Sequence, residues 1–374
     1  MKILELCHFS AGICGVWTRV REESLRLSDK GNEVRVFSSN LTKGTNEIAS
    51  DLDRIGKVVI RRFSAIKLGG ESFMKWNFEK EALEYEPEII IAHCYRHPHT
   101  TKALKVAETL RNKGKKCKVF LVTHAPFERN ETRKPFSKFA VWYYDKFIGP
   151  KTLNRFYKIL AITQWEIPYL VECGANTDKI EYIPNGIPEE FFRQKKSKEK
   201  RKILFLGRIS PIKNIETVIS ALPLLADKKI QFEIVGPAEK EYLERLKKLA
   251  AELSVEKQII FGEAIYDIGE KIRKIDSASI FVLPSKSEGM PQGLIEAMAR
   301  GKRVIASDNL ASKDLIIEGK TGYLFEIGNS EELAIKINDI LKNENKKVGK
   351  EAAKYVKQFS WDKIIVKILK FLND

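Results

Sequence analysis

The stretch SIFVLPSKSEGMPQGLIEAMARGKRVIAS, residues 279–307, is the part of this sequence that best defines the fold. It opens with a short apolar run, Ser279–Leu283, turns through glycine and proline, and continues as a helical pattern over residues 291–300. A second apolar run, Arg303–Ala306, follows at once. Short apolar runs of this kind are typical of strands covered on both faces of a parallel sheet, and a helix is the usual crossover between them. The stretch therefore predicts a βαβ unit.

The same alternation of strand and helix runs along the chain in two series. The charged stretch QKKSKEKRK, residues 194–202, separates them and has the composition of an exposed linker. We therefore expect an α/β fold of two doubly wound, Rossmann-like domains facing across a cleft. In that architecture ligands bind at the carboxyl ends of the strands. The expected strands are Ile3–Leu6, Glu33–Phe37, Val58–Phe63, Glu88–Ala92, Lys118–Val122, Ile159–Ile162 and Ile180–Ile183, then Ile203–Leu206, Gln231–Val235, Gln258–Phe261, Ser279–Leu283, Arg303–Ala306 and Tyr323–Phe325.

Composition narrows the class of protein. With 374 residues, of which 43% are hydrophobic, the chain is large enough to fill two cores. Met1 and Lys2 lead directly into the first strand, so we expect no signal peptide, and no apolar run approaches the roughly 20 residues that cross a bilayer. The five cysteines are odd in number and include no C-x-x-C pair. We therefore expect neither a disulfide framework nor structural zinc, and a reducing cytoplasmic location.

The net charge of +16 calls for an anionic partner, and composition alone does not choose among phosphate, a lipid surface and nucleic acid. Residues 102–158 hold 15 Lys and Arg against four acids, whereas the rest of residues 1–185 holds 16 basic and 18 acidic residues. Within this region, residues 127–158 are also rich in aromatic side chains, and Phe136, Phe139, Tyr143 and Phe147 recur at helical spacing. Such a segment either lies on an anionic membrane surface or packs its aromatics into the core. No recognition motif accompanies the charge, so we expect no nucleic-acid partner.

Two cations follow the first strand of the second series. The motif GRISPIKN, residues 207–214, places Arg208 and Lys213 after a turn at Gly207 and near the start of the next helix. Glycine lets the backbone approach a ligand, and a helix N-terminus favours anions. The next strand also ends in glycine, at Gly236. Together these features favour a diphosphate site, and the alternative is that both cations are solvated surface charges.

Two carboxylates flank the next turn. Glu288 lies in the glycine-rich turn after Ser279–Leu283, and Glu296 lies about two turns further along, inside the following helix. Carboxylates accept paired hydrogen bonds from vicinal hydroxyls, which sugars and ribose both present. Taken singly, Glu288 is equally well an acid in a first helical turn, and Glu296 a residue on a solvated helix face.

The combined pattern, Gly-Arg-x4-Lys-Asn and then Glu-Gly-x6-Glu-Ala-Met-Ala, resembles the signature of the family-four retaining glycosyltransferases of GT-B fold. The likeness continues in residues 183–187 (IPNGI) and 359–361 (FSW). It implies that Arg208 and Lys213 hold the donor diphosphate. It also implies that Glu288 lies at the transferred sugar and that Glu296 binds ribose hydroxyls. The further donor-binding residues that it implies are Gly15, Gly207, Gly236, Gly289, Met290 and Pro291.

The resemblance also implies an organisation and a reaction. Residues 1–190 form the acceptor domain, residues 191–350 the donor domain, and residues 351–374 the C-terminal helices, the last of which returns to the N-terminal domain. The enzyme transfers a hexose with retention, without a metal or cofactor, to a glycan, lipid-linked or small-molecule acceptor. It is cytoplasmic, and peripheral on the inner membrane face if its basic aromatic segment binds lipid. The alternatives are a sugar-nucleotide epimerase of the same fold and a non-catalytic basic binding protein.

Three departures from the family's pattern leave the donor sugar open. Met290 stands where phenylalanine is usual, and Arg303 stands where proline is usual. The segment Asn309–Asp314 replaces the usual Gly-Gly…Glu segment.

The first half of the chain offers fewer signals. The loop after the first strand is no G-x-G-x-x-G fingerprint, which argues against a nicotinamide enzyme. It resembles the family's glycine loop, where Gly15 matches and Cys14 departs, and a plain strand-to-helix turn is the alternative. His124 follows the strand Lys118–Val122 and corresponds to a family histidine that contacts the donor sugar, which makes it a candidate catalytic residue. The alternative is a structural histidine.

Two further patterns in this half are weaker. His93, His97 and His99 cluster after the strand Glu88–Ala92, a spacing that allows a metal site, although no carboxylate ligand is evident and an acceptor-side loop fits better. Asp51-Leu52-Asp53 spells the D-x-D of metal-dependent transferases of another fold. It precedes a strand rather than following one, and we interpret it as chance.

Overall fold

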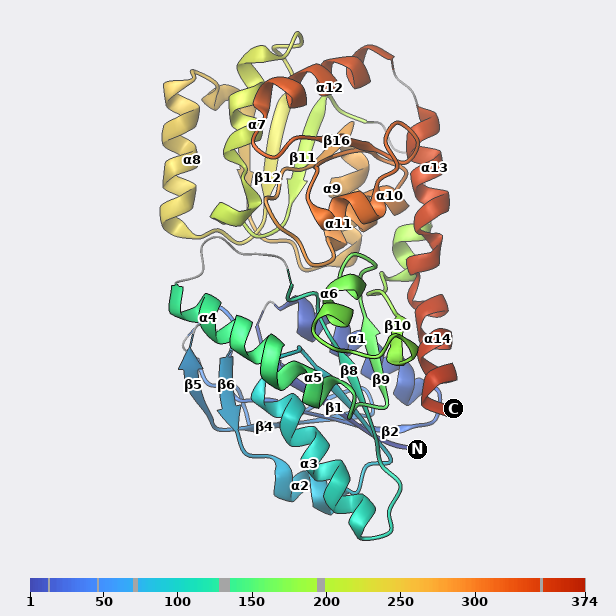
Figure 1. Ribbon diagram of the computed structural model, residues 1–374. Coiled ribbons are helices and arrows are strands. Elements are labelled where there is room, and N and C mark those ends of the chain that lie inside the picture. The colour runs from blue at the N-terminus through green and yellow to red at the C-terminus, as the bar shows by residue number, and fades with distance from the viewer. Residues whose placement is uncertain are drawn as a thin grey trace. The chain divides into compact units, whose positions relative to one another are not determined.

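The computed structural model describes residues 1–12, 14–45, 47–69, 73–127, 135–193, 199–343 and 346–373. Tertiary contacts divide the chain into two compact units, which are residues 1–185 with 364–374, and residues 186–363. Each unit is built on a mainly parallel sheet with helices packed against it, which confirms the predicted fold class (Figure 1).

The first unit contains an eight-stranded sheet and a small hairpin. Its strands are β1 (Lys2–Phe9), β2 (Glu33–Ser39), β3 (Leu52–Ile55), β4 (Val58–Phe63), β5 (Ala65–Gly69), β6 (Phe73–Trp76), β7 (Ile89–His93), β8 (Lys118–Val122), β9 (Lys158–Ala161) and β10 (Ile180–Tyr182); its helices are α1 (Gly15–Asp29), α2 (Glu79–Tyr85), α3 (Pro98–Asn112), α4 (Pro135–Tyr143), α5 (Gly149–Leu153) and α6 (Ile167–Glu172). The sheet order is β10-β9-β8-β7-β1-β2-β4-β3. The chain runs outward from β1 to β2 and, in the opposite direction, from β7 to β8. Right-handed crossovers therefore put α1 and α3 on opposite faces, and the order reverses between β1 and β7.

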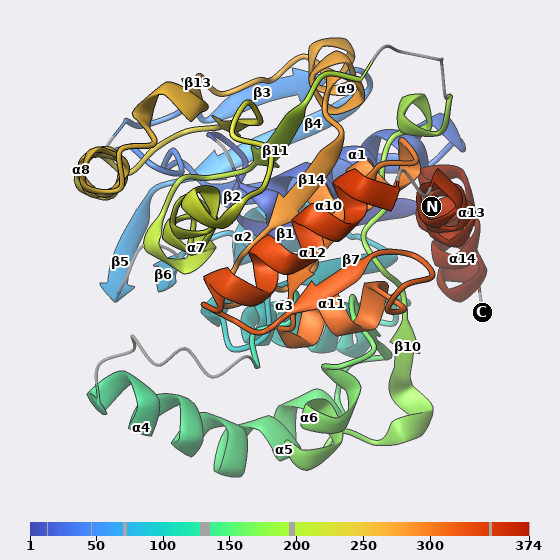
Figure 2. The same ribbon diagram turned by 90° about the horizontal axis from the view of Figure 1, so that it is seen from above.

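The second unit repeats this plan with a six-stranded parallel sheet. Its strands are β11 (Lys202–Leu206), β12 (Gln231–Val235), β13 (Ile259–Gly262), β14 (Ile280–Leu283), β15 (Arg303–Ser307) and β16 (Tyr323–Phe325); its helices are α7 (Glu216–Ala221), α8 (Lys240–Glu252), α9 (Ile268–Ser277), α10 (Gln292–Ala299), α11 (Leu310–Leu315), α12 (Ser330–Asn343) and α13 (Lys346–Val356). The sheet order is β13-β12-β11-β14-β15-β16, so the order reverses between β11 and β14. Helix α10 packs along β14 (Figure 2). A last helix, α14 (Trp361–Asn373), begins in this unit and ends in the residues that cluster with the first one.

The central strands are buried from end to end. Every residue of β7, β14 and β15 is buried, because helices cover both faces of each sheet. This burial is why the sequence shows nearly continuous apolar runs at these places. Glu5 in the middle of β1 and Glu233 in β12 are buried carboxylates in these strands, at 0% and 5% exposure.

Every strand predicted from the sequence is present, and the described residues contain three further strands that were not predicted. The hairpin β5–β6 and the edge strand β3 carry mixed polar sequences without a continuous apolar run. The D-x-D motif precedes β4, the predicted strand Val58–Phe63, and it also overlaps the strand β3, which was not predicted. Asp53 Oδ2 lies 3.0 Å from an Arg62 guanidinium nitrogen and forms an ion pair with it.

The described residues contain neither a membrane-spanning helix nor a disulfide. None of their helices combines the length and the apolar composition that crossing a bilayer requires. None of the five cysteines forms a disulfide with another described residue, and all five are buried.

Candidate donor-binding site

The loops after β11 and β14 come together because these two strands are neighbours in the second sheet. The backbone N–H of Lys286 donates to the carbonyl of Ile212 at 2.9 Å and ties one loop to the other. Lys213 Nζ lies 2.5 Å from Glu288 Oε1, and Ser285 Oγ donates to the same oxygen at 2.6 Å. A cation and a carboxylate 75 residues apart thus meet at the carboxyl edge of the sheet, where the strand order reverses.

A close backbone crossing shapes the first of these loops. Gly236, directly after β12, has φ +147°, and a Cβ built on it would lie 2.0 Å from the carbonyl oxygen of Gly207. Neither the conformation nor the space admits a side chain. Gly236 is therefore required by backbone packing, in addition to the role at the donor that the sequence predicts for it.

The two cations of this loop differ in exposure. The Lys213 side chain is 17% exposed, whereas the Arg208 side chain is 54% exposed and its ion pair with Glu239 spans 3.9 Å. Pro211–Lys213 forms a 3₁₀ turn, and the helix after it, α7, has only six residues. The helix begins three residues after Lys213, as predicted, and the contribution of its N-terminus to anion binding stays a prediction. The positive charge of the loop comes from the two side chains.

Glu296 lies in α10, as predicted, but its environment was not foreseen. The residue is only 6% exposed, which excludes the solvated helix face. Lys271 Nζ of α9 donates to Glu296 Oε1 at 2.7 Å and lies 2.5 Å from Oε2, so the two residues form an ion pair. The second carboxylate of the motif is therefore fixed by a lysine from another helix, while the first is fixed by Lys213.

The connection between the two carboxylates is short and tightly packed. Gly289, Met290 and Pro291 lead from Glu288 into α10, and Pro291 is its N-cap residue. A Cβ built on Gly293 would lie 3.0 Å from the carbonyl oxygen of Leu206 at the end of β11. The helix can approach the strand this closely only because glycine occupies that position.

One of the departures from the family's pattern supports the site. Asn309 Nδ2 donates to the carbonyl of Ser285 at 2.9 Å, and its Oδ1 accepts the N–H of Ser312 at 2.9 Å as the cap of α11. Ser307 Oγ donates to the same carbonyl of Ser285. The segment that begins at Asn309 therefore holds the loop that carries Glu288.

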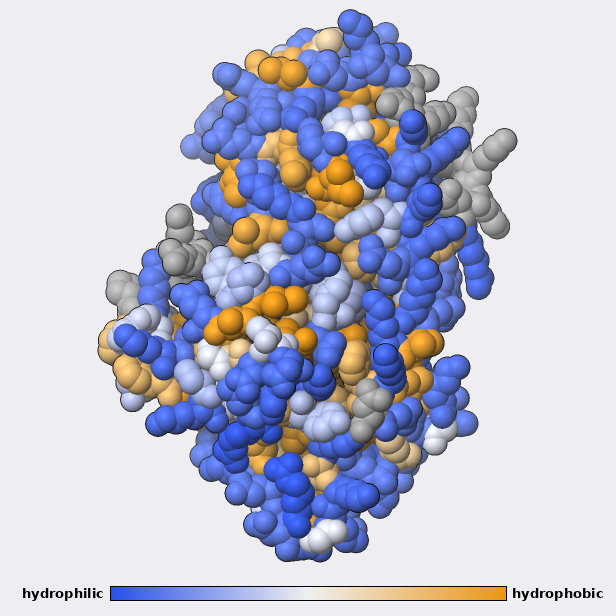
Figure 3. Space-filling view, turned by 45° about the vertical axis from the view of Figure 1, so that its right-hand side comes forward, coloured by the Kyte–Doolittle hydropathy of each residue, from blue (hydrophilic) through white to orange (hydrophobic). Residues whose placement is uncertain are grey.

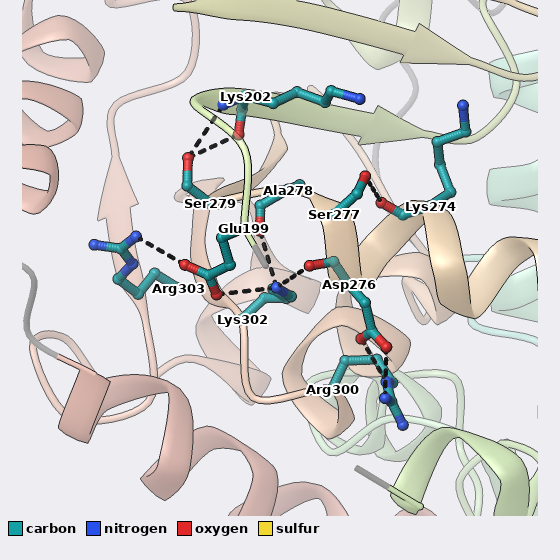
Figure 4. Close-up of polar contacts among 10 residues, drawn as sticks. All are labelled: Glu199, Lys202, Lys274, Asp276, Ser277, Ala278, Ser279, Arg300, Lys302 and Arg303. Carbon is teal, nitrogen blue, oxygen red and sulfur yellow. Dashed lines mark hydrogen bonds and ion pairs between the residues drawn. The ribbon is translucent and has the colours of Figure 1, made fainter. Parts of the chain in front are cut away.

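Arg303, another departure, lies at the opposite edge of the sheet, where β15 begins. Figure 4 shows it with Lys302, both directed at the carboxylate of Glu199. Arg303 also donates to the carbonyl of Ile340 at 3.0 Å, near the end of α12. An arginine here holds two chain segments together, so this departure concerns packing and carries no information on the donor sugar.

The first unit contributes Gly15 and His124 as candidates. Gly15 is the first residue of α1, and a Cβ built on it would meet nothing within 4 Å, so packing alone does not require glycine there. His124 follows β8 with φ +60° and is half-buried. Its Nε2 lies 2.9 Å from His93 Nδ1. Burial lowers the pKa of His124 well below its ordinary value, so the imidazole is neutral.

The histidine cluster does have a carboxylate partner, contrary to the sequence-based prediction. Glu5 Oε2 lies 2.6 Å from His93 Nε2. Glu5, Glu23 and His93 offer atoms within 4.8 Å of one another, as a metal site would. However, Arg19 Nε already donates to Glu23 at 3.0 Å, and a guanidinium opposes a second cation. These residues therefore form a hydrogen-bonded network.

Sequence reasoning missed five residues of these networks, which are Lys271, Ser285, Arg19, Glu23 and Glu5. Lys271 carries no local signal, since its partner Glu296 lies 25 residues away. Ser285 lies three residues from Glu288, and Arg19 lies four residues from Glu23, a spacing that brings side chains together on a helix. Glu5 also carried a local signal, because a carboxylate inside an otherwise apolar buried strand needs a specific partner.

Comparison with known proteins agrees with this architecture. The family profile of glycosyl transferases group 1 matches residues 186–359, and that of glycosyltransferase family 4 matches residues 13–191. An uncharacterized glycosyltransferase from Methanocaldococcus jannaschii is 30% identical, over 94% of this chain and 93% of its own length. The phosphatidyl-myo-inositol mannosyltransferase of Mycolicibacterium smegmatis is 26% identical, over 99% of this chain and 93% of its own.

Among solved structures, HepE from Anabaena in complex with UDP-glucose has a TM-score of 0.76 at 18% identity, over 100% of this chain and 99% of that one. At this identity the likeness shows the GT-B fold alone. The two profiles, which together cover most of both units, and the full-length relative show more. The chain belongs to the family-four glycosyltransferases of GT-B fold, and it is a glycosyltransferase.

Proposed function

We propose that this enzyme takes its sugar from a nucleoside-diphosphate donor bound at the carboxyl edge of the second sheet. The observation that carries the proposal is that Lys213, Glu288 and Ser285 meet after the carboxyl ends of the neighbouring strands β11 and β14. A donor of this class presents phosphates next to sugar hydroxyls, so it calls for a cation beside a carboxylate. The UDP-glucose bound in HepE supports the same class of donor.

Each candidate residue then has a role. Arg208 and Lys213 bind the diphosphate, and Glu288 accepts hydrogen bonds from the transferred hexose. The lysine ammonium has three N–H donors, so Lys213 serves a phosphate oxygen while retaining Glu288. Glu296 binds ribose hydroxyls, and His124 donates to a hydroxyl of the hexose. The remaining contacts come from the backbone at Gly15, Gly207, Gly236, Gly289, Met290 and Pro291.

The proposed reaction retains the configuration of the sugar and uses no metal. The bond from the anomeric carbon to the diphosphate oxygen breaks, and its electron pair goes to that oxygen. Arg208 and Lys213 stabilise the charge that develops there. The acceptor hydroxyl oxygen bonds to the anomeric carbon on the same face, and its proton passes to the leaving phosphate. Membership of the retaining family supports this stereochemistry.

We further propose that the acceptor is a lipid or lipid-linked glycan at an anionic membrane surface. The support comes from α4 and the π-helical turn after it, Tyr144–Ile148. Phe139, Trp142, Tyr143 and Phe147 are 60%, 49%, 49% and 46% exposed, which argues against burial of these aromatics in the core. Residues 128–134 and the Phe136 side chain lie outside the described part of the chain. One relative is named for a phosphatidyl-myo-inositol substrate, which also favours lipid.

The charge around these aromatics suits the same partner. Lys146 Nζ lies 5.2 Å from the centre of the Trp142 ring, and Lys138 and Lys151 are exposed on the neighbouring turns. The face drawn in Figure 3 is mostly hydrophilic, with separate hydrophobic patches. Aromatic rings among lysines are typical of segments that lie at a bilayer interface.

The donor proposal is tested by calorimetric titration of nucleoside diphosphates and their sugars in EDTA. We expect saturable binding that added magnesium or manganese leaves unchanged. Binding that disappears with the chelator and returns with the metal would show that the metal-free mechanism is wrong. Incubating the preferred donor without acceptor is the control, because an epimerase would convert the sugar under those conditions.

A further inference from the structure

A chain of three hydrogen-bonded side chains crosses the first sheet. Glu5 lies in β1, His93 ends β7, and His124 follows β8, and these strands are consecutive neighbours. Glu5 Oε2 lies 2.6 Å from His93 Nε2, and His93 Nδ1 lies 2.9 Å from His124 Nε2. Glu5 and His93 are 0% exposed, whereas His124 is half-buried. The chain therefore leads from the interior to an edge of the sheet.

Charge balance indicates which atom of this chain holds the proton. Arg19 and Glu23 form a buried ion pair at 3.0 Å, which satisfies the one guanidinium with one carboxylate. Glu5 is then a second carboxylate in the same interior without a cation of its own. Burial raises the pKa of Glu5 to about 8, against the lowering effect of Arg19. At neutral pH Glu5 is mainly protonated.

The direction of both hydrogen bonds follows from that proton. His93 is neutral, because burial lowers its pKa to about 3, so it carries a single N–H. Glu5 donates its O–H to His93 Nε2, which leaves the His93 proton on Nδ1. That N–H donates to His124 Nε2, and the proton of the neutral His124 must then be on Nδ1. An ionised Glu5 would reverse every donor and acceptor in the chain.

Two observations show that His124 Nδ1 is available to a ligand. Among the described residues it has no hydrogen-bond partner, and it is not one of the fully buried atoms left unpaired. The neighbouring His93 is also held in place, since His99 Nε2 donates to its backbone carbonyl at 2.7 Å. The hydrogen-bonded chain thus ends at His124 Nδ1, and His93 holds the His124 ring in place.

We propose that Glu5 and His93 are positioning residues that fix the tautomer of His124, so that His124 presents an Nδ1–H donor to a hydroxyl of the transferred sugar. The contact with the sugar rests on the proposed function. The tautomer is a property of the free protein and stands independently of it. A histidine fixed in this way stabilises a sugar oxygen without exchanging a proton with it.

The imidazole nitrogens report the tautomer directly. The protein has only five histidines, so ¹⁵N-histidine labelling and single substitutions assign the signals of every imidazole ring. At pH 7 we expect a protonated, pyrrole-type shift at His124 Nδ1 and a pyridine-type shift at Nε2. The reverse assignment in the unmodified enzyme overturns the proposal, and this measurement requires no variant to fold.

Variants separate Glu5 from general packing. In Glu5→Gln the amide N–H still donates to His93 Nε2, so the His124 shifts stay as they are. In Glu5→Leu no donor remains, and both His124 nitrogens move toward averaged values; unchanged shifts there would overturn the role of Glu5. His97→Gln, outside the chain, is the matched control and leaves the His124 nitrogens unaltered.

Kinetics then test the sugar contact separately. We expect Glu5→Leu to lower kcat roughly tenfold or more while nucleotide affinity, measured by calorimetry with the nucleoside diphosphate alone, stays within about twofold. A normal kcat with a displaced tautomer would overturn the sugar contact. If the unmodified enzyme does not bind the nucleoside diphosphate, the donor proposal is contradicted. The tautomer result does not depend on that binding.

Discussion

Lys213 and Glu288 hold each other at 2.5 Å, so each residue is the other's partner as well as a candidate contact of the donor. We expect Lys213→Ala and Glu288→Ala each to lower kcat about 100-fold, because each removes a group aimed at charge or hydroxyls of the transition state. Steady-state kinetics measure this. Lys247→Ala, an exposed lysine in α8 with its own glutamate partner, is the control for lost charge. Near-normal kinetics in both site variants would show that neither Lys213 nor Glu288 contributes to the reaction.

Glu296 gives a contrasting expectation at the same scale. Ribose does not change during the reaction, so its contacts are equal in ground and transition states. Glu296→Ala should therefore weaken nucleotide binding about tenfold with kcat little altered, since losing a hydrogen bond to a charged group costs about 1.5 kcal/mol. The variant also leaves Lys271 without its partner. Lys271→Ala breaks the same ion pair but keeps Glu296, so it is the control. A fall in kcat without weaker binding would contradict the ribose assignment.

The titration of the Glu5 carboxyl group makes the free energy of unfolding depend on pH. Its folded pKa of about 8 exceeds its ordinary value, so its contribution to stability is complete below about pH 4.5 and is lost as pH rises through 8. The amide that replaces this carboxyl group in the variant Glu5→Gln does not titrate. The free energy of unfolding of the variant, relative to the unmodified enzyme, should therefore rise by roughly 3–5 kcal/mol between pH 4.5 and 9. Urea titrations across this range measure it, and a constant difference would show that Glu5 is ionised at neutral pH.

At the scale of elements, burial decides what the sequence can predict. Inner strands such as β8 and β12 match their predicted bounds because helices cover both faces and force continuous apolar runs. Edge elements such as β3 and the β5–β6 hairpin have no such constraint and were missed. The sequence predicted that Lys213 and Glu288 each follow a strand, but not that they pair, because that depends on β11 and β14 being neighbours. The lysine at Glu296 was not predicted either, because α9 reaches it only in three dimensions.

The segment formed by α4 and Tyr144–Ile148 is the element whose function is most open to a direct test. We expect the enzyme to sediment with anionic vesicles, less so in high salt, and not with neutral vesicles, since each lysine near such a surface contributes roughly 1 kcal/mol. Replacing Trp142 and Phe147 by alanine should reduce the anionic binding about tenfold or more. Ile335→Ala on α12 removes an equally exposed apolar side chain and is the control. Equal absence from all pellets would favour a soluble acceptor.

For the whole molecule, titratable groups are distributed unequally between the two units. All five histidines lie between His8 and His124, in the first unit. Burial lowers the pKa of four of them, His8, His93, His99 and His124. A lowered histidine pKa gives stability that is complete above about pH 6.5 and is lost as pH falls toward the folded value. Glu5 and Glu166, whose pKa burial raises to about 8 and about 7, oppose this loss until about pH 4.5.

The balance between the buried histidines and the buried carboxyl groups of the first unit predicts that acid unfolds this unit before the second. Between pH 6.5 and 4.5 the four histidines take up protons on unfolding, whereas Glu5, Glu166 and Glu23, whose pKa values burial raises, release them. The histidines outnumber these carboxyl groups, so unfolding takes up protons and the first unit loses stability as pH falls. The second unit has no histidine to contribute such a term. Tryptophan fluorescence reports mainly the first unit, which contains Trp17, Trp76, Trp142 and Trp165, whereas Trp361 lies in the second. Calorimetry at pH 7 and pH 5 should show the transition that tracks this fluorescence moving to lower temperature, while a transition that nucleotide shifts upward stays in place. If both transitions move together with pH, the histidine network is not the acid-sensitive element of the molecule.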